Sequence, residues 1–368
     1  MISSIHLENF RLFSNLDISC NHKLVIFSGK NAVGKTSILE AIYLASTSKS
    51  HRTNDLSSLI KNDSLEAKIE IIANKKYKII LNKDKKLFFI NKVQIKKISD
   101  FVGNLDVVLF SPSDLSLING SPGDRRKFID LEISLLNKEY LHALSNYKKV
   151  LQARNELLKS KKIDEILLNI YTDDLIKYLK IIYEYRISFI DNINEIFTDI
   201  TKKINIENIK LKYLPTVNIK NADECFKGRL KQDSILKTTT IGTHRDDFQI
   251  LINDRLAKEY ASEGQKRTIC IALMLALKEY IYKTTNREAI LLLDDVFMAL
   301  DKSRIESITK YVMDSKQCFI TTTSILEIPD ELLHDALVIR ISNWYIERRS
   351  FYKKARNIYG RKWKDNWS

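Results

Sequence analysis

Residues 29–36 constrain the fold of this chain more than any other feature. They read GKNAVGKT, which matches the pattern G-x-x-x-x-G-K-[ST] in full. The apolar run 24–27 precedes them and a helical pattern over 35–46 follows, so this stretch joins a buried strand to a helix. A turn of this kind is a phosphate loop, and a domain of the α/β class is the fold expected to carry it.

The residue types in the loop suit the binding of ATP and Mg²⁺. Glycines let the backbone wrap closely, so that its N–H groups point at phosphates, and the helix N-terminus adds a partial positive charge. Lys35 can reach the terminal phosphates, and the Thr36 hydroxyl can hold Mg²⁺. The predicted ATP-binding residues are Gly29, Lys30, Asn31, Ala32, Val33, Gly34, Lys35, Thr36 and Ser37.

Two adjacent aspartates follow an apolar run later in the chain. Residues 290–293 read as a buried strand that ends at Asp294 and Asp295. In this class of ATPase, such a strand is expected beside the strand that leads into the phosphate loop. Its first carboxylate approaches Mg²⁺ and the next polarises the attacking water. We therefore predict Thr36 and Asp294 as Mg²⁺ ligands, and Asp294 and Asp295 as catalytic residues.

A helix start with the sequence SEGQKR occupies residues 262–267. Ser262 is a natural N-cap and Gln265 completes a capping box, so a well-capped helix is one interpretation. The interval to Asp294 favours another, because ABC-type ATPases place an S-x-G-Q/E helix start at about this distance before their Asp-bearing strand. There the helix N-terminus binds the γ-phosphate of ATP held by the partner subunit. We predict this role, in trans, for Ser262, Gly264 and Gln265.

The apolar patterns divide the chain into four segments. Residues 1–122 read as strands around one helix with an antiparallel meander, and 123–205 read as a helical insert lobe. Residues 206–330 return to strands and complete the head, and 331–368 form a basic, aromatic C-terminal segment. The predicted fold is an ABC/SMC-type P-loop ATPase head, with a mixed β-sheet core and an inserted α-helical lobe.

Charge and cysteine content narrow the choice of partners and compartment. The net charge of +14 favours a polyanion, nucleic acid before an anionic membrane, although the Lys-rich composition of the whole chain supplies part of the surplus. The four scattered cysteines form no CxxC pair, which argues against a zinc site and fits a reducing cytosol. The sequence shows neither a signal peptide nor a run long enough to span a bilayer. We therefore expect a cytoplasmic protein without a membrane partner.

Over nearly its whole length, the sequence resembles the RecF family. The matching motifs are NFR at 9–11, SHRT at 50–53, FSPSD at 110–114, GSP at 120–122, RR at 125–126, L-x-x-R-N at 151–155, GTHRDD at 242–247, ASEGQKRT at 261–268, LDDV at 293–296 and LD at 300–301. Threonines at 321–323 stand where many ABC proteins carry a switch histidine, which RecF also lacks. Departures are Ala32 for glycine, Ser113 for an acidic residue, Thr243 for proline and Ala299 for glutamate. None of them removes a phosphate or Mg²⁺ ligand.

The resemblance implies an ATP-dependent homodimer, with ATP held between subunits, that acts in DNA replication, recombinational repair and the SOS response. It implies binding to single-stranded, gapped and duplex DNA, and loading of a recombinase together with RecR and RecO. ATP hydrolysis would be slow, stimulated by DNA, and would serve as a switch. Whether the protein acts as an enzyme in its own right stays open. The resemblance assigns no DNA-contacting residue.

Other interpretations stay open beside this one. The chain could be another SMC-like ATPase of phage defence or of chromosomes, a small-molecule phosphotransferase, or a nucleotide-gated DNA clamp with negligible turnover. The C-terminal segment is also ambiguous, because Trp344, Trp363 and Trp367 lie among basic residues. These aromatic side chains either dock the segment onto the core or stack on bases beside cations that follow the phosphates.

Overall fold

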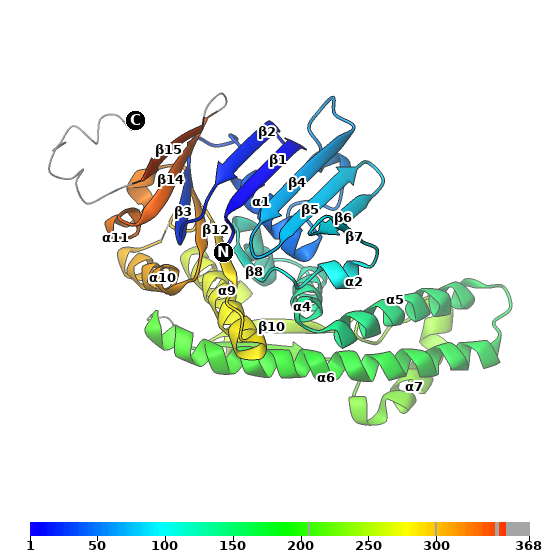
Figure 1. The fold of residues 1–368 in the computed structure, drawn as a ribbon. Helices are drawn as coiled ribbons and strands as arrows, with labels where there is room; N and C mark the ends of the chain where they lie inside the picture. Colours follow the sequence, from blue (N-terminus) through cyan, green and yellow to red (C-terminus); the bar gives the residue numbers. More distant parts are fainter. Residues whose placement is uncertain (205–206, 299, 343–345, 351–368) are drawn as a thin grey trace, which may run out of the picture. The chain divides into compact units, whose positions relative to one another are not determined.

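The computed structural model describes residues 1–204, 207–298, 300–342 and the backbone of 346–350. The chain divides into two compact units (Figure 1). Unit 1 joins Met1–Ser113 to Ile281–Ser368, and unit 2 is the intervening stretch Asp114–Tyr280. Unit 1 is therefore built from two separated parts of the chain.

Unit 1 contains a mostly parallel sheet in the strand order β15-β14-β3-β13-β12-β8. Its strands are β3 (Leu24–Ser28), β8 (Val107–Phe110), β12 (Ile290–Asp294), β13 (Cys318–Thr322), β14 (Ala336–Ile341) and β15 (Ile346–Ser350). Strands β3, β8, β12 and β13 are buried along their whole length, which is why they read as short continuous apolar runs. Only β15 of this sheet pairs antiparallel, at its edge against β14.

The prediction that the Asp-bearing strand adjoins the phosphate-loop strand is wrong. β13 lies between β3 and β12 and is parallel to both, so that Ile320 is paired with Ile26 on one side and Leu293 on the other. Because all three strands run in one direction, their carboxyl ends still meet at the same edge of the sheet. The inserted strand brings Thr321 to that edge, directly opposite Asp294.

The other sheet of unit 1 is antiparallel, in the order β2-β1-β4-β5-β6-β7. Its strands are β1 (Ser4–Phe10), β2 (Phe13–Ser19), β4 (Glu66–Ile72), β5 (Lys76–Asn82), β6 (Lys86–Ile90) and β7 (Val93–Ile95). The predicted antiparallel meander is confirmed as β4 to β7, and a turn with positive φ at Asn91 and Lys92 separates β6 from β7. Strands β1 and β2 extend this sheet on its other side.

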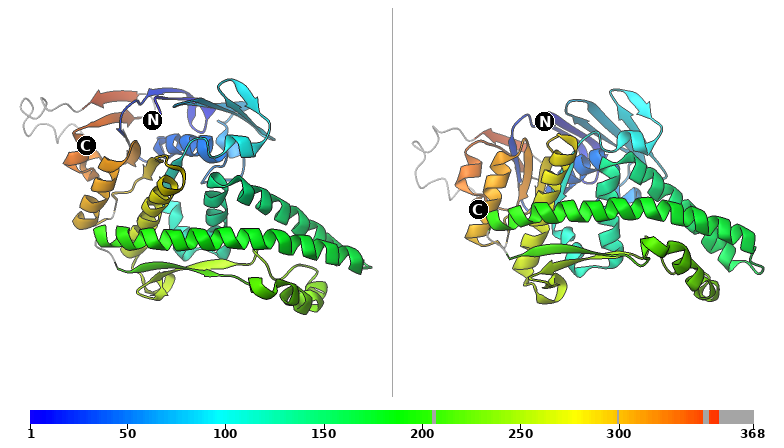
Figure 2. Two further views of the ribbon diagram at one scale, coloured as in Figure 1. Left: turned by 60° about the horizontal axis from the view of Figure 1, so that its bottom comes forward. Right: turned by 90° about the horizontal axis from the view of Figure 1, so that it is seen from below.

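Helix α1 joins the two sheets of unit 1 into one hydrophobic core. It contacts strands of both sheets, and its apolar residues are buried almost all round. The helices of unit 1 are α1 (Lys35–Thr47), α2 (Ile98–Phe101), α10 (Lys302–Asp314) and α11 (Asp330–Leu333), with short 3-10 turns at Ser57–Leu59 and Ile325–Glu327. Figure 2 shows these elements from two further directions.

Unit 2 combines long helices with a small antiparallel sheet, β11-β10-β9. Its elements are α3 (Ser116–Asn119), α4 (Pro122–Leu136), α5 (Lys138–Lys159), α6 (Glu165–Lys203), β9 (Ile209–Leu214), α7 (Ala222–Leu236), β10 (Asp247–Ile252), β11 (Arg255–Leu256), α8 (Ala257–Tyr260) and α9 (Glu263–Thr285), which ends in unit 1; 3-10 turns lie at Pro112–Leu115 and Ile219–Asn221.

The predicted helical stretch 123–205 is occupied by α4, α5 and α6. Strands β9 and β10, expected in the ATPase head, pair with each other here, and α7 was not expected.

Two buried arginines tie the helices of unit 2 together. Arg186 on α6 reaches Asp130 on α4 at 2.7 Å, and Arg154 on α5 reaches Asp233 on α7 at 2.8 Å. Removing one partner of such a buried ion pair leaves an uncompensated charge, which costs several kcal/mol. The family-like motif at 151–155 therefore has a structural basis in Arg154.

The structure bears on the expectation about membrane spans, but some residues singled out in the sequence lie outside its described part. Within the described ranges, no helix combines the length and the apolar character needed to cross a membrane. The tryptophans at 344, 363 and 367 lie outside the described residues. Ala299, one of the departures from the family pattern, lies outside them as well.

Candidate nucleotide-binding site

The phosphate loop leaves the end of β3 and runs into α1. Gly34, the N-cap of α1, has a φ of 100°, and Ala32 has a φ of 65°. A Cβ at Gly34 would lie 2.6 Å from the ring of Phe13, and a Cβ at Gly29 would lie 2.3 Å from the carbonyl oxygen of Ile341. Both glycines are therefore required by packing. Ala32 adopts a left-handed conformation that costs a non-glycine residue about 1 kcal/mol, which explains why glycine is the usual residue there.

The ammonium group of Lys35 lies under the loop that precedes it. It donates to the carbonyl oxygens of Gly29 at 2.7 Å and Lys30 at 2.9 Å. Burial lowers the pKa of Lys35, and the negative charges of Asp295 and Asp294 act in the opposite direction. The side chain is thus placed where a cation would meet phosphate groups that the loop's N–H groups bind.

Thr36 and the two aspartates meet at the carboxyl edge of the parallel sheet. The Thr36 hydroxyl donates to the Asp294 carboxylate at 2.9 Å. Thr321 contacts both aspartates, because its hydroxyl donates to Asp294 Oδ1 at 2.6 Å and accepts the backbone N–H of Asp295 at 3.0 Å. The structure therefore brings together the three residues predicted at Mg²⁺ and the attacking water. It also adds Thr321, which the sequence analysis had noted only for standing in the region of the switch histidine.

The oxygen groups of Thr36 and Asp294 fit a Mg²⁺ ion. This cation prefers hard oxygen ligands and usually takes only one or two from the protein, with waters and substrate phosphates filling the rest. A bound Mg²⁺ would neutralise charge that develops on the phosphates. No cluster of three or more His, Cys, Asp or Glu side chains suited to a metal occurs in the described part of the chain.

A buried carboxylate on α1 organises two arginines beside the phosphate loop. Glu40 is wholly buried and receives two hydrogen bonds from Arg11, at 2.6 and 2.8 Å, and one from Ser50. Arg52 is 3.6 Å from the same carboxylate and is nearly half exposed. Arg11 also donates to the carbonyl oxygen of Ser58 at 2.7 Å, which fixes its guanidinium plane. The family-like motifs at 9–11 and 50–53 thus meet at one residue, Glu40.

Several of these groups, among them Lys35, Thr36 and Asp295, line one cavity of unit 1, with a volume of about 580 Å³. That volume lies in the range of small-molecule sites. Besides residues of the phosphate loop, its lining consists of Arg11, Leu12, Arg52, Ser58, Ile60, Lys61, Asn62 and Asp295. The sequence analysis noted Arg11 and Arg52 only as family-like residues, because their approach to the loop depends on chain reversals that no local pattern encodes.

We expect Glu40→Gln to lower the free energy of unfolding by about 3 kcal/mol. The amide leaves the Arg11 guanidinium, which is 16% exposed, without a counter-charge in a largely buried site. Chemical denaturation would measure the loss, and Glu70→Gln is the matched control. Glu70 also pairs with two cations, Lys76 and Lys78, but those lysines are about one third exposed, so its loss should stay near 1 kcal/mol. Equal losses in the two variants would contradict the special role of Glu40.

The residues predicted to bind the γ-phosphate in trans, Ser262, Gly264 and Gln265, lie in unit 2 at the start of α9. The Gln265 side chain accepts the Ser262 N–H at 2.8 Å, and the Ser262 hydroxyl accepts the Gln265 N–H at 3.2 Å, so the predicted capping box is present. The Gln265 amide also donates to the carboxylate of Glu207. Within its own unit, this helix start is a well-formed N-terminus, and the role in trans stays a prediction.

The fold and the site together define the class of protein: an ABC/SMC-type P-loop ATPase head, in which a phosphate loop meets an Asp-bearing strand. The family model described as RecF/RecN/SMC N terminal domain matches residues 1–331. The Smc head domain of Pyrococcus furiosus shares this fold, with a TM-score of 0.54, 16% identity and 96% of its chain covered against 95% of this one.

Nearer relatives identify the branch within that class. The DNA replication and repair protein RecF of Acholeplasma laidlawii is 42% identical over 325 residues, which is 88% of this chain and 93% of that protein. RecF of Clostridium perfringens is 39% identical over 94% of this chain and 99% of its own length. A solved structure of the recombination mediator RecF with ATP, from the RecFOR pathway, matches with a TM-score of 0.86 and 29% identity over 95% of this chain and 99% of that one. The chain belongs to the RecF family.

Proposed function

We propose that this chain is an ATP-dependent DNA-binding protein of recombinational repair and replication-fork maintenance. The contact between Thr36 and Asp294 at the phosphate loop, 2.9 Å long, is the observation that carries the nucleotide part of this proposal. The 580 Å³ cavity beside it has room for a nucleotide, and the relatives matched over most of the chain are RecF proteins. In this proposal, residues 29–37 bind ATP, Thr36 and Asp294 hold Mg²⁺, and Asp295 polarises the attacking water.

The same proposal makes ATP a switch for dimerisation. Ser262, Gly264 and Gln265 of one subunit would bind the γ-phosphate held by the other, and slow hydrolysis would release the dimer. The uncovered N–H groups of a helix start attract an anion. In unit 2 the Gln265 amide contacts Glu207, so that a phosphate would have to replace this carboxylate as its partner. Dimerisation would thus depend on the triphosphate form of the nucleotide.

We expect Ser262→Arg to leave ATP binding by the single subunit intact while it blocks dimerisation and hydrolysis. The long cationic side chain would occupy the position in which a γ-phosphate has to approach the helix start, and Ser262 is not among the residues that line the nucleotide cavity. Calorimetry would measure ATP affinity, and gel filtration with ATP would measure assembly. Ser262→Thr keeps the N-cap hydroxyl and serves as the control. If Ser262→Arg still dimerises with ATP, Ser262 is only an N-cap.

DNA is the proposed macromolecular partner, in single-stranded, gapped and duplex forms, with RecR and RecO as protein partners and the cytoplasm as the place of action. The net charge of +14 supports a polyanionic partner, and the solved RecF relative is described as a mediator of the RecFOR pathway. The deciding experiment measures binding to the three DNA forms with and without ATP. Binding that requires neither DNA ends nor ATP would favour the alternative of a chromosome-associated SMC-like ATPase. Absence of DNA binding would overturn the proposal.

A further inference from the structure

Two neighbouring arginines of unit 2 have no acidic partner. Arg126 lies near the start of α4, and Arg245 lies in the turn that leads into β10 (Figure 1). Among the residues that the structure describes, neither guanidinium forms an ion pair with a carboxylate. We call these two residues the arginine pair. It places two positive charges on unit 2 that no described side chain neutralises.

The carboxylates next to the arginine pair are already occupied. Asp247 accepts two hydrogen bonds from Arg125, at 2.7 and 2.9 Å. Asp246 is buried and accepts the Tyr213 hydroxyl at 2.5 Å and the backbone N–H of Thr216 at 2.7 Å. Neither aspartate could turn to another arginine without losing these contacts. The counter-charge for the arginine pair therefore has to come from a bound anion.

The turn that carries Arg245 is fixed by its neighbours. His244 contacts the Tyr147 hydroxyl at 2.8 Å and the carbonyl oxygen of Thr239 at 3.0 Å. The carbonyl contact needs an N–H on the imidazole, so the Tyr147 hydroxyl donates to the other ring nitrogen when the ring is neutral. The backbone N–H of Arg245 donates to the carbonyl oxygen of Gly242 at 2.8 Å. The backbone of Arg245 is thus held in place while its side chain is exposed.

Arg126 is held against the same turn. Its guanidinium donates to the carbonyl oxygen of Asp246, the residue after Arg245, at 2.7 Å. Burial is the main cause of a His244 pKa lowered to about 4, and the positive charges of Arg245 and Arg126 contribute to this shift. Both charges therefore act on one imidazole, which is neutral near pH 7. Most of the five N–H donors of the Arg126 guanidinium stay available to a ligand.

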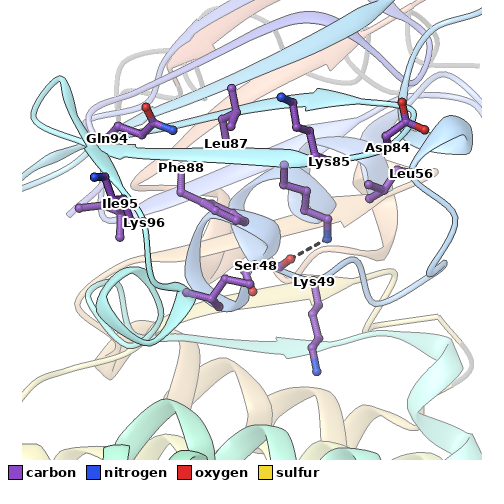
Figure 3. Close-up of a pocket in the computed structure, with 12 residues that line it drawn as sticks. Ser48, Lys49, Leu56, Asp84, Lys85, Leu87, Phe88, Gln94, Ile95 and Lys96 are labelled. Carbon is purple, nitrogen blue, oxygen red and sulfur yellow. Dashed lines mark hydrogen bonds between the residues drawn. The ribbon is translucent and has the colours of Figure 1, made fainter. Parts of the chain in front are cut away.

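Lysines around a second cavity of unit 1, of about 590 Å³, are arranged differently (Figure 3). Lys86 donates to the carbonyl oxygen of Ser48 at 2.8 Å, whereas Lys49 and Lys85 extend to opposite sides. These cations diverge, so they do not offer one ligand a common site. Positive charge alone does not distinguish the arginine pair; its convergence on one fixed turn does.

The arginine pair is separate from the helix start proposed to bind the γ-phosphate. Arg245 precedes β10. Gln265 contacts Glu207, two residues before β9, and β9 begins opposite Ile252, the last residue of β10. A strand of this length covers roughly 17 Å, at about 3.4 Å per residue. One phosphate group cannot bridge that distance, so the arginine pair has to bind a different anion.

We propose that Arg126 and Arg245 bind the phosphate backbone of DNA. The proposal rests on the proposed function, which makes DNA the partner, and adds residues that contact it. A guanidinium presents its donors as a planar fork that matches a phosphate group. Arg126 supplies a fork held against the turn, and the exposed Arg245 can adjust to the strand. Phosphate contacts carry no sequence information, so this binding is independent of base sequence.

The test compares three double variants. Arg126→Ala/Arg245→Ala removes both charges, and Arg126→Lys/Arg245→Lys keeps the charges but loses the planar forks. Lys85→Ala/Lys96→Ala removes two exposed cations of unit 1 and controls for net charge. Fluorescence anisotropy with a labelled duplex, with ATP and at several salt concentrations, gives affinity and salt dependence. ATP titration and chemical denaturation confirm that each variant is folded and keeps its nucleotide site.

The double alanine variant of the arginine pair should bind duplex DNA roughly tenfold more weakly or worse. Its slope of log affinity against log salt should shrink by about 2, because each phosphate contact contributes about 0.9. Arg245→Ala alone removes no described contact, so it should fold normally and shrink the slope by about 1. The double lysine variant should keep most of the slope but lose affinity several-fold, and the unit 1 control should keep the wild-type slope.

Wild-type affinity and slope in the double alanine variant would overturn the proposal. Equal losses in that variant and in the unit 1 control would also overturn it, because net charge alone would then explain the binding. If the wild-type protein binds none of the three DNA forms, the proposed function itself fails. The two failures are therefore distinguishable.

Discussion

Lys35→Met should weaken ATP binding by about 100-fold or more and abolish ATP-driven dimerisation. The ammonium group lies beneath the loop, bonded to the carbonyl oxygens of Gly29 and Lys30. Methionine has a similar length but no charge, so the terminal phosphates would lose a charge-assisted contact at a buried side chain. Loss of about 3 kcal/mol, the upper range for hydrogen bonds to charged groups, corresponds to this factor.

Isothermal titration of ATP into both proteins measures this effect directly. Lys30→Met is the matched control, because it removes the same charge from an exposed side chain of the same loop. The control should retain affinity to within a few-fold, since an exposed charge is screened by solvent and salt. Unchanged ATP affinity in Lys35→Met would refute the assignment of residues 29–37 as the ATP site.

The two aspartates should separate binding from hydrolysis. Asp295→Asn is expected to keep ATP binding but to slow hydrolysis by about 100-fold or more, because the amide no longer accepts a proton from the attacking water. Asp295 has a φ of 46°, a left-handed value that asparagine tolerates well, so the substitution should not disturb the backbone. The slowed enzyme should then accumulate as an ATP-bound dimer.

Asp294→Asn is expected to act earlier, on Mg²⁺-dependent binding. Its carboxylate accepts the hydroxyls of Thr36 and Thr321, and the amide oxygen can still accept them, but the negative charge that attracts the cation is lost. ATP titrations with and without Mg²⁺, together with phosphate-release rates, distinguish the two variants. Two variants that both hydrolyse ATP at the wild-type rate would show that neither aspartate has the assigned role.

Local patterns predicted the parts of the site that are contiguous in sequence. The phosphate loop, the Asp-bearing strand and the capped start of α9 each carry their information within about ten residues. Glu40 is different, because it is one polar residue of a helix that is buried almost all round. Its partners, Arg11 and Arg52, come from a turn between strands and from the loop after α1. Only the folded chain shows that they share one carboxylate.

The sheet order and the extent of the insert were harder to predict for a related reason. Strand β13 is buried like its neighbours, and no residue in it indicates that it inserts between β3 and β12. Strands β9 and β10 also look like ordinary half-buried strands, and they pair with each other while β9 packs against α6 and β10 against α4. Helix α7 has mixed composition and a weak apolar face, so its sequence gives little periodic signal.

Thr321 gives the site a chemical property that the aspartates alone would not. A threonine hydroxyl stays uncharged at every physiological pH, whereas a histidine in this position would gain or lose a proton near neutrality. Burial lowers the pKa of His51, which the charges of Glu40 and Asp294 oppose, so that burial favours the neutral imidazole. Neither the Thr321 hydroxyl nor the His51 imidazole is therefore expected to carry a charge near neutral pH. The ATP-dependent switch of the proposed function would then depend on the concentrations of nucleotide and partner, and little on pH.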